Sequence, residues 1–191
     1  MKLKTQEIID KRGNRVVIRE GKISDSKELQ KCVKSYLKSK QIPLTESEFN
    51  ELAENHEEWI KKFIDGKNDL LLIAEHEGTI VGNIDLMING RQMLKHTGYI
   101  GMGIHEDWQG QGIGTAMFKI LIDWVDHNPD IEILWLQAFS NNEKGLRIYS
   151  NMGFEETGRQ KGFIKTESGE YIDNVIMTRN KQQTANNVYT K

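Results

Sequence analysis

A glycine-rich segment between a strand-like run and an amphipathic helix constrains this chain more than any other feature. Tyr99–Ile104 has the character of a strand, Trp108–Ala116 follows it, and apolar side chains then recur at helical spacing. A turn that joins a strand to a helix directs several unpaired backbone N–H groups to one point, where the helix dipole favours phosphate. Gly110, Gly112 and Gly114 let that backbone approach a ligand closely. The segment therefore predicts a phosphate-binding loop in an α/β fold.

The spacing of this loop excludes two common phosphate-binding motifs. A nucleotide-hydrolysing P-loop ends in Lys-Ser/Thr, and no such pair ends this loop. A dinucleotide-binding turn requires Gly-x-Gly-x-x-Gly, whereas the glycines here alternate with single residues. The pattern that fits is Gln-x-x-Gly-x-Gly, formed by Gln109, Gly112 and Gly114.

This pattern resembles the signature with which the GNAT superfamily of N-acetyltransferases holds the pyrophosphate of acetyl-coenzyme A. A second signature of that superfamily is matched downstream by Asn142-x-x-Gly145-x-x-x-Tyr149-x-x-x-Gly153-Phe154, with Gly145 where alanine is usual. Residues 169–177 are similar to the last strand of a bacterial branch that includes amino-acid, polyamine and protein N-terminal acetyltransferases. The resemblance extends from Ile18 to Arg179 and implies a GNAT fold.

The expected elements follow the order β-α-α-β-β-β-α-β-α-β-β, which predicts one α/β domain over residues 15–179 with a mixed central sheet flanked by helices. The resemblance implies that the two parallel strands of this sheet splay apart. Residues 1–14 are an N-terminal extension that we expect to form a hairpin with the following strand, and residues 180–191 form a polar tail that we expect to be disordered.

Three capping boxes predict helix starts. They are Asp25-x-x-Glu28, Thr45-x-x-Glu48 and Ser140-x-x-Glu143. The second of these helices is expected to turn five large side chains to the core: Leu52, Trp59, Ile60, Phe63 and Ile64.

Composition is that of an ordinary globular domain. The 191 residues are 37% hydrophobic and 28% charged, and the net charge of −2 provides no basic surface for nucleic acid. We expect a cytoplasmic protein, because no signal peptide and no membrane span stands out. Cys32 is the single cysteine, so an internal disulfide is excluded and no metal cluster is expected. We interpret Cys32 as a buried structural residue rather than a nucleophile.

The resemblance implies acetyl-coenzyme A as co-substrate and assigns the residues that hold it. Backbone groups of the strand end would bond the pantetheine arm, and the loop would surround the pyrophosphate. The implied cofactor-binding residues are Met102, Gly103, Ile104, Gln109, Gly110, Gln111, Gly112, Ile113, Gly114, Thr115, Asn142 and Tyr149.

Acetyl transfer to an amine also needs an acid and a base. Tyr149 stands where the superfamily keeps the general acid for the leaving thiolate, and a phenol remains protonated at neutral pH. Many relatives carry a glutamate base at the position aligned with Gly98, and that carboxylate is missing here. Three alternatives for the base remain open: His96, Asp85 and a relayed water.

The acceptor is expected to be a primary amine of a small molecule, and specifically of an amino acid. The acetyl group is expected to pass to it directly, in a ternary complex. Without a strong carboxylate base, an α-amine with a pKa of about 8 is easier to deprotonate than an amine with a pKa of about 10.4. Arg91 is a candidate ligand for the carboxylate of an amino acid. A polyamine, a peptide N-terminus such as that of a ribosomal protein, and a non-catalytic acetyl-coenzyme A sensor are the alternatives. Neither nucleic acid nor a membrane is an expected partner, and a homodimer is possible for this superfamily.

Overall fold

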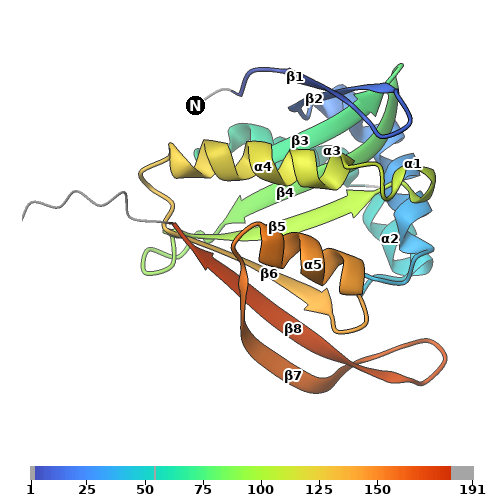
Figure 1. Ribbon diagram of the computed structural model, residues 1–191, viewed down its shortest axis with the longest axis vertical. Coiled ribbons are helices and arrows are strands. Elements are labelled where there is room, and N and C mark those ends of the chain that lie inside the picture. Colours follow the sequence, from blue (N-terminus) through green and yellow to red (C-terminus); the bar gives the residue numbers. More distant parts are fainter. Residues whose placement is uncertain (1–2, 54, 182–191) are drawn as a thin grey trace, which may run out of the picture.

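The computed structural model describes residues 3–53 and 55–181, which form one α/β domain around a mixed sheet (Figure 1). Its eight strands lie in the order β1-β2-β3-β4-β5-β6-β8-β7, and only β5 and β6 pair in parallel. The strands are β1 (Gln6–Ile9), β2 (Arg15–Glu20), β3 (Leu70–His76), β4 (Thr79–Ile88), β5 (Thr97–Ile104), β6 (Ile133–Phe139), β7 (Glu155–Lys165) and β8 (Tyr171–Asn180). The helices are α1 (Ser26–Leu37), α2 (Glu46–Ala53), α3 (His56–Asp65), α4 (Ile113–Asp126) and α5 (Glu143–Asn151).

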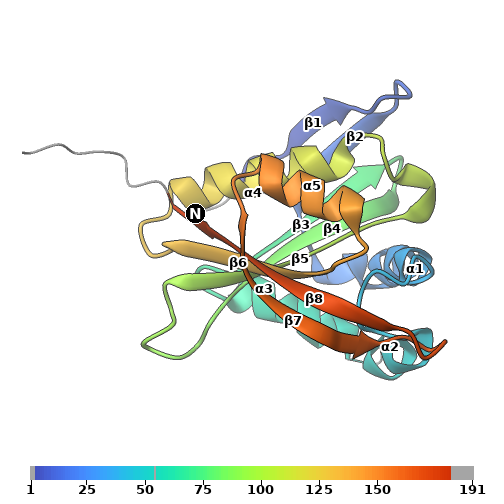
Figure 2. The ribbon, with the colours of Figure 1, turned by 60° about the horizontal axis from the view of Figure 1, so that its bottom comes forward.

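Helices cover both faces of the sheet (Figure 2). α4 and α5 lie on one face, and α1, α2 and α3 lie on the other. The larger apolar cluster joins α4 to the sheet through fully buried side chains such as Phe118 and Leu121. The smaller cluster joins α1 and α3 to β3, with Leu29, Ile60 and Ile73 at its centre. The predicted fold class, a mixed sheet flanked by helices, is confirmed.

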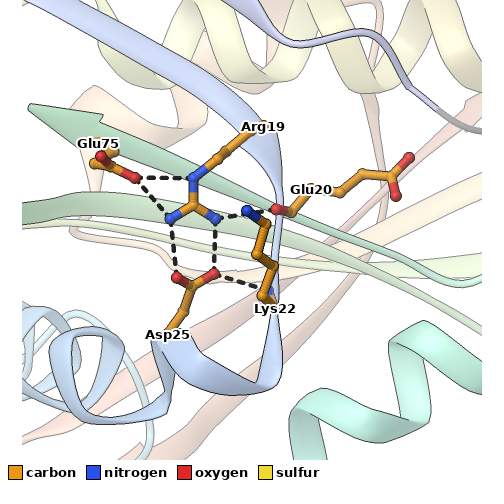
Figure 3. Close-up of polar contacts among 5 residues, drawn as sticks. All are labelled: Arg19, Glu20, Lys22, Asp25 and Glu75. Carbon is orange, nitrogen blue, oxygen red and sulfur yellow. Dashed lines mark hydrogen bonds and ion pairs between the residues drawn. The ribbon is translucent and has the colours of Figure 1, made fainter. Parts of the chain in front are cut away.

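An arginine on β2 fixes the start of α1 against the sheet (Figure 3). The Arg19 guanidinium lies between Glu75 on β3, at 2.6 Å, and Asp25 before α1, at 2.7 Å. The Asp25 carboxylate also accepts a hydrogen bond of 2.7 Å from the Lys22 N–H. Among the described residues it forms no side-chain cap on α1, so the capping box predicted at Asp25 is wrong. Charge pairing with Arg19 has taken the carboxylate that would have capped the helix.

The second predicted helix is divided into α2 and α3. Its capping box is confirmed, because the Thr45 N–H donates to the Glu48 carboxylate at 2.8 Å and the Glu48 N–H donates to the Thr45 hydroxyl at 3.3 Å. Ile60 and Phe63 are buried as expected. Leu52 and Ile64 are 60% and 50% exposed, so their predicted core positions are wrong. Leu52 lies on α2, a separate helix from α3, and Ile64 lies outside the buried face of α3.

The predicted N-terminal hairpin can be compared with the structure, whereas most of the predicted C-terminal tail cannot. β1 pairs antiparallel with β2, which confirms the N-terminal hairpin. β8 includes Asn180, the first residue of the predicted tail, whereas residues 182–191 lie outside the described residues. No helix in the described part of the chain is long and apolar enough to cross a membrane.

Candidate active site

The two parallel strands separate at the centre of the sheet. β5 and β6 pair only from Thr97 with Ile133 to Tyr99 with Trp135, although β5 continues to Ile104. β6 therefore offers no ladder partner to the backbone of β5 beyond Tyr99, where the Ile104 carbonyl instead accepts a hydrogen bond of 3.2 Å from the Gln109 Nε2. The splayed pair implied by the sequence is confirmed.

The predicted phosphate loop lies where β5 ends. Gly112 precedes α4 in the left-handed conformation, with φ of 89°, and Gly110 has φ of 75°. The first α-helical bond of α4 runs from the Ala116 N–H to the Gly112 carbonyl. Because a glycine precedes the helix, no side chain caps the amides of its first turn. These amides are available for an anion, and the helix dipole strengthens that preference.

Strand, loop and helices enclose a cleft of about 830 Å³, a size typical of small-molecule sites. Most of the predicted cofactor residues line it, which brings the strand end, the loop and the start of α5 together. These are Met102, Gly103, Ile104, Gln109, Gly110, Gly112, Ile113, Gly114, Thr115 and Asn142. Two other predicted residues, Gln111 and Tyr149, belong to the same segments but do not line the cleft.

One face of α5 is directed to this cleft. Asn142 caps the helix, because its Oδ1 accepts a hydrogen bond of 3.0 Å from the Gly145 N–H. The helix begins at Glu143, so the capping box predicted at Ser140 is wrong. A Cβ at position 145 would come within 2.6 Å of the Asn142 Nδ2, which explains why glycine suits a position where the superfamily keeps alanine.

Tyr149 lies two turns further along the same face of α5. Its side chain is 9% exposed, and its ring contacts Phe118 of α4 with 5.5 Å between centroids. Burial raises the pKa of Tyr149 to about 12, with a smaller contribution in the same direction from the nearby Tyr99. The phenol is therefore protonated at every physiological pH and can only donate a proton.

On the opposite face of the sheet, Asp85 of β4 pairs with Gly101 of β5. A Cβ at position 101 would come within 2.9 Å of the Asp85 Oδ2. Burial raises the pKa of Asp85 to about 6, although a backbone hydrogen bond from Gly101 lowers it in part. A carboxyl group with this pKa can exchange a proton near neutral pH.

Two residues that the sequence did not single out lie beside Asp85. The Tyr36 hydroxyl donates to the Asn83 Oδ1 at 3.2 Å, and the Asn83 Nδ2 donates to Asp85 at 3.4 Å. The Tyr36 ring occupies the space above Gly103, where a Cβ would come within 2.2 Å of it. Gly101 and Gly103 are two residues apart, so they lie on the same face of the strand. This spacing is the sequence signal that could have indicated large side chains packed against that face.

Gln41 was also missed. It lines the cleft between α1 and α2, and its Oε1 is the one buried side-chain oxygen or nitrogen without a hydrogen-bond partner among the described residues. A buried amide oxygen left unpaired is unfavourable by about 1–3 kcal/mol. It is therefore a candidate acceptor for a ligand N–H group.

His96 and Arg91 lie away from this cluster. Both precede β5, whereas the cleft lies beyond its other end, and a strand rises by roughly 3.3 Å per residue. The Arg91 N–H donates to the Asn89 Oδ1 within the β4–β5 loop. Neither residue lines the cleft.

Cys32 is buried in α1 and 1% exposed. Burial raises the pKa of its thiol to about 12, with a smaller opposing effect from a backbone hydrogen bond with His105. The thiol is therefore protonated at neutral pH, as a structural cysteine is.

Comparisons with known proteins agree with this geometry. The model of the Acetyltransferase (GNAT) family matches residues 31–154. The L-amino acid N-acetyltransferase AaaT of Escherichia coli is 25% identical over 123 residues, which are 64% of this chain and 75% of that protein. The ribosomal protein bS18-alanine N-acetyltransferase of the same organism is 26% identical over 112 residues, 54% of this chain and 74% of that protein.

The fold is also that of solved acetyltransferases. A putative acetyltransferase from Salmonella typhimurium, solved with its cofactor acetyl-CoA, superposes with a TM-score of 0.77 at 18% identity. The superposition covers 89% of this chain and 96% of that one.

Proposed function

Because the chain belongs to the Acetyltransferase (GNAT) family, we propose that it transfers the acetyl group of acetyl-coenzyme A directly to the α-amine of an amino acid. The chain is an acyltransferase, and acetyl-coenzyme A is the co-substrate of its family. The observation that carries the proposal for the acceptor is the partly buried carboxylate of Asp85, opposite Gly101 of the strand that lines the cleft.

The residues of the cleft fit the co-substrate. The amides at the start of α4 and the loop residues Gln109–Gly112 provide donors for the pyrophosphate. The backbone of Met102 and Ile104, on the splayed part of β5, provides partners for the amides of the pantetheine arm. Asn142, at the start of α5, lines the same cleft and would border that arm.

We assign the base to Asp85 rather than to His96. Neither side chain lines the cleft, but Asp85 lies opposite Gly101, two residues before the cleft residue Gly103, whereas His96 precedes the strand. The Asp85 carboxylate takes a proton from the acceptor ammonium, directly or through a water. The neutral amine then adds to the thioester carbonyl carbon, the carbon–sulfur bond breaks with its electron pair on the sulfur, and the nitrogen loses its remaining extra proton to water.

We assign the acid to Tyr149, which donates its hydroxyl proton to the departing thiolate sulfur. Tyr149 is protonated at neutral pH, as a proton donor must be, although burial raises its pKa to about 12 and makes it a weaker acid than an exposed phenol. No acetyl-enzyme intermediate is involved in this mechanism. The buried, protonated thiol of Cys32 is unsuited to act as a nucleophile.

The pKa values favour an α-amine as acceptor. A base with a pKa of about 6 is roughly 2 units below a peptide-type α-amine and more than 4 units below a lysine-type amine. The difference corresponds to about 3 kcal/mol of deprotonation free energy. Similarity to the L-amino acid N-acetyltransferase AaaT supports a free amino acid.

A peptide N-terminus is the second candidate acceptor. It contains the same α-amine, and the relative that acetylates ribosomal protein bS18 is similar to this chain at 26% identity. A ligand for the carboxylate of a free amino acid would distinguish the two, and Arg91 does not line the cleft in this structure.

The test is release of free thiol from acetyl-coenzyme A in the presence of one acceptor class at a time. Free L-amino acids, polyamines and short peptides with free N-termini form the panel, and binding of coenzyme A is measured in parallel by calorimetry. We expect release with amino acids and loss of release in Tyr149→Phe and Asp85→Asn.

The other outcomes distinguish the alternatives. Release only with peptides would support the second candidate, and release only with polyamines would overturn the α-amine assignment. Tight binding of acetyl-coenzyme A without release from any acceptor would support a sensor. Absence of binding would contradict the assignment of the cleft.

A further inference from the structure

The N-terminal hairpin is an addition to the matched family region. The family model begins at residue 31, so β1 and its turn to β2 lie outside it. Asp10 organises this turn and is only 5% exposed. Its carboxylate accepts hydrogen bonds of 2.8 Å from the Arg12 N–H and 2.8 Å from the Asn14 N–H. The turn is therefore held in one conformation, although it lies at the edge of the sheet.

This turn contacts the phosphate loop. The Lys11 N–H donates to the Gln111 carbonyl at 3.3 Å, and Lys11 lines the cleft together with Gln109 and Gly110. A second connection runs through His76 of β3, whose Nδ1–H donates to the Arg15 carbonyl at 2.9 Å and whose ring packs against Trp108. The hairpin and the loop that precedes α4 thus form one wall of the cleft.

Lys11 is charged, exposed and without a carboxylate partner among the described residues. On the opposite wall of the same cleft, α5 provides two more cations, Lys144 and Arg147, beside the acidic Glu143. The cleft therefore carries a net positive charge at its phosphate end, while the whole chain has a net charge of −2. A local excess of cations in an acidic protein is what a polyanionic ligand requires.

We propose that Lys11 forms an ion pair with a phosphate of coenzyme A, so that the N-terminal hairpin is part of the cofactor site. This inference rests on the proposed function only through the identity of the co-substrate. Lys11 would act on affinity for the coenzyme and on its salt dependence, because each phosphate contact from a lysine is electrostatic. It would not act on the acceptor.

The experiment compares substitutions at two neighbouring residues of one turn. Dissociation constants for coenzyme A are measured by calorimetry for the wild type, Lys11→Gln and Lys11→Arg. The matched control is Arg12→Gln. It removes the same charge from the neighbouring residue, but Arg12 does not line the cleft. Each titration is repeated with 3′-dephospho-coenzyme A and at two salt concentrations.

We expect Lys11→Gln to weaken binding of coenzyme A by about threefold to tenfold at low salt. Arg12→Gln should change it by less than about twofold, and Lys11→Arg should retain wild-type affinity. If Lys11→Gln has no effect on 3′-dephospho-coenzyme A, the partner is the 3′-phosphate, and an equal effect on both ligands assigns the pyrophosphate.

Equal dissociation constants for Lys11→Gln and Arg12→Gln would overturn the inference and leave the proposed function intact. Failure of the wild type to bind coenzyme A would instead contradict the proposed function. Thermal denaturation of each variant without ligand excludes a folding defect as the cause.

Discussion

Asp85 on β4 lies directly opposite Gly101 on β5, and its carboxylate fills the space that a side chain at position 101 would occupy. The pairing brings an ionisable group next to the strand that lines the cleft. It also partly desolvates that group, which raises its pKa from 3.8 to about 6. One cross-strand pair thus sets both the position and the proton affinity of the proposed base.

Replacement of Asp85 by asparagine should lower kcat/KM by about a hundredfold or more, the contribution of a general base. In the wild type, kcat/KM should rise as the pH passes about 6, because the carboxylate form is the active one. Asp85→Asn should lose that rise while its affinity for coenzyme A is retained. A pH–rate profile from pH 5 to 9 provides the measurement. A wild-type profile without an inflection near 6, or an unaltered profile in the variant, would contradict this role.

The same carboxyl group predicts a pH dependence of stability. Its pKa is higher in the folded state, so its contribution is complete below pH 3.8 and is lost as the pH rises through about 6. About 2 pKa units correspond to a fall of up to roughly 3 kcal/mol in the free energy of unfolding. Asp85→Asn should therefore gain stability relative to the wild type between pH 4 and pH 7. Urea denaturation across that range measures the difference, and a difference independent of pH would exclude Asp85 as its cause.

Much of the site could be predicted because the residues that form it are close together in the sequence. The glycine spacing around Gly112 and the apolar stripe of the following helix determine a loop and a helix start, whatever the rest of the chain does. The pairing of Asp85 with Gly101 depends on the register of two strands, which a single sequence does not specify. The contact of Lys11 with the phosphate loop joins residues 100 positions apart, and no local pattern indicates it.

The failed predictions have specific causes. Asp25 matches a helix cap in sequence, yet Arg19 on the preceding strand takes its carboxylate. That ion pair outweighs a local capping preference of about 1 kcal/mol. Leu52 and Ile64 fit one helical stripe in sequence, but they lie on two separate helices and each is at least half exposed.

Replacement of Gly103 by alanine should displace the Tyr36 ring, because the new Cβ would come within 2.2 Å of it. We expect a loss of about 1–3 kcal/mol in the free energy of unfolding. The Tyr36–Asn83 hydrogen bond beside Asp85 should also be disturbed. Gly90→Ala is the control, since no atom lies within 4 Å of the Cβ it would introduce. Equal denaturation midpoints for the two variants would contradict the close contact.

Replacement of Arg19 by methionine should destabilise the fold by about 2 kcal/mol, because two carboxylates lose their shared partner. Arg15→Met is the control, since the Arg15–Glu7 pair is more than half exposed and should contribute little to stability. The loss of stability caused by Arg19→Met should be smaller at low pH. Burial would raise the pKa of Asp25, but its hydrogen bonds with Arg19 and Lys22 hold it below its usual value. That contribution is therefore present above about pH 4 and is lost on acidification. Urea denaturation at pH 7 and pH 3 tests both statements.

Replacement of Gln41 by leucine should separate stability from function. The buried Oε1 has no partner in this structure, so its removal should stabilise the free protein by about 1 kcal/mol. If the oxygen accepts an N–H of the acceptor, KM for the acceptor should rise by about threefold to tenfold, with the dissociation constant of coenzyme A unchanged. Gln92→Leu, on the exposed β4–β5 loop, is the matched control. Thermal denaturation and acceptor kinetics are the two readouts.

Weaker binding of coenzyme A with an unchanged KM for the acceptor would assign Gln41 to the pantetheine arm instead. A variant that is less stable than the wild type would show that the amide is satisfied in the free protein.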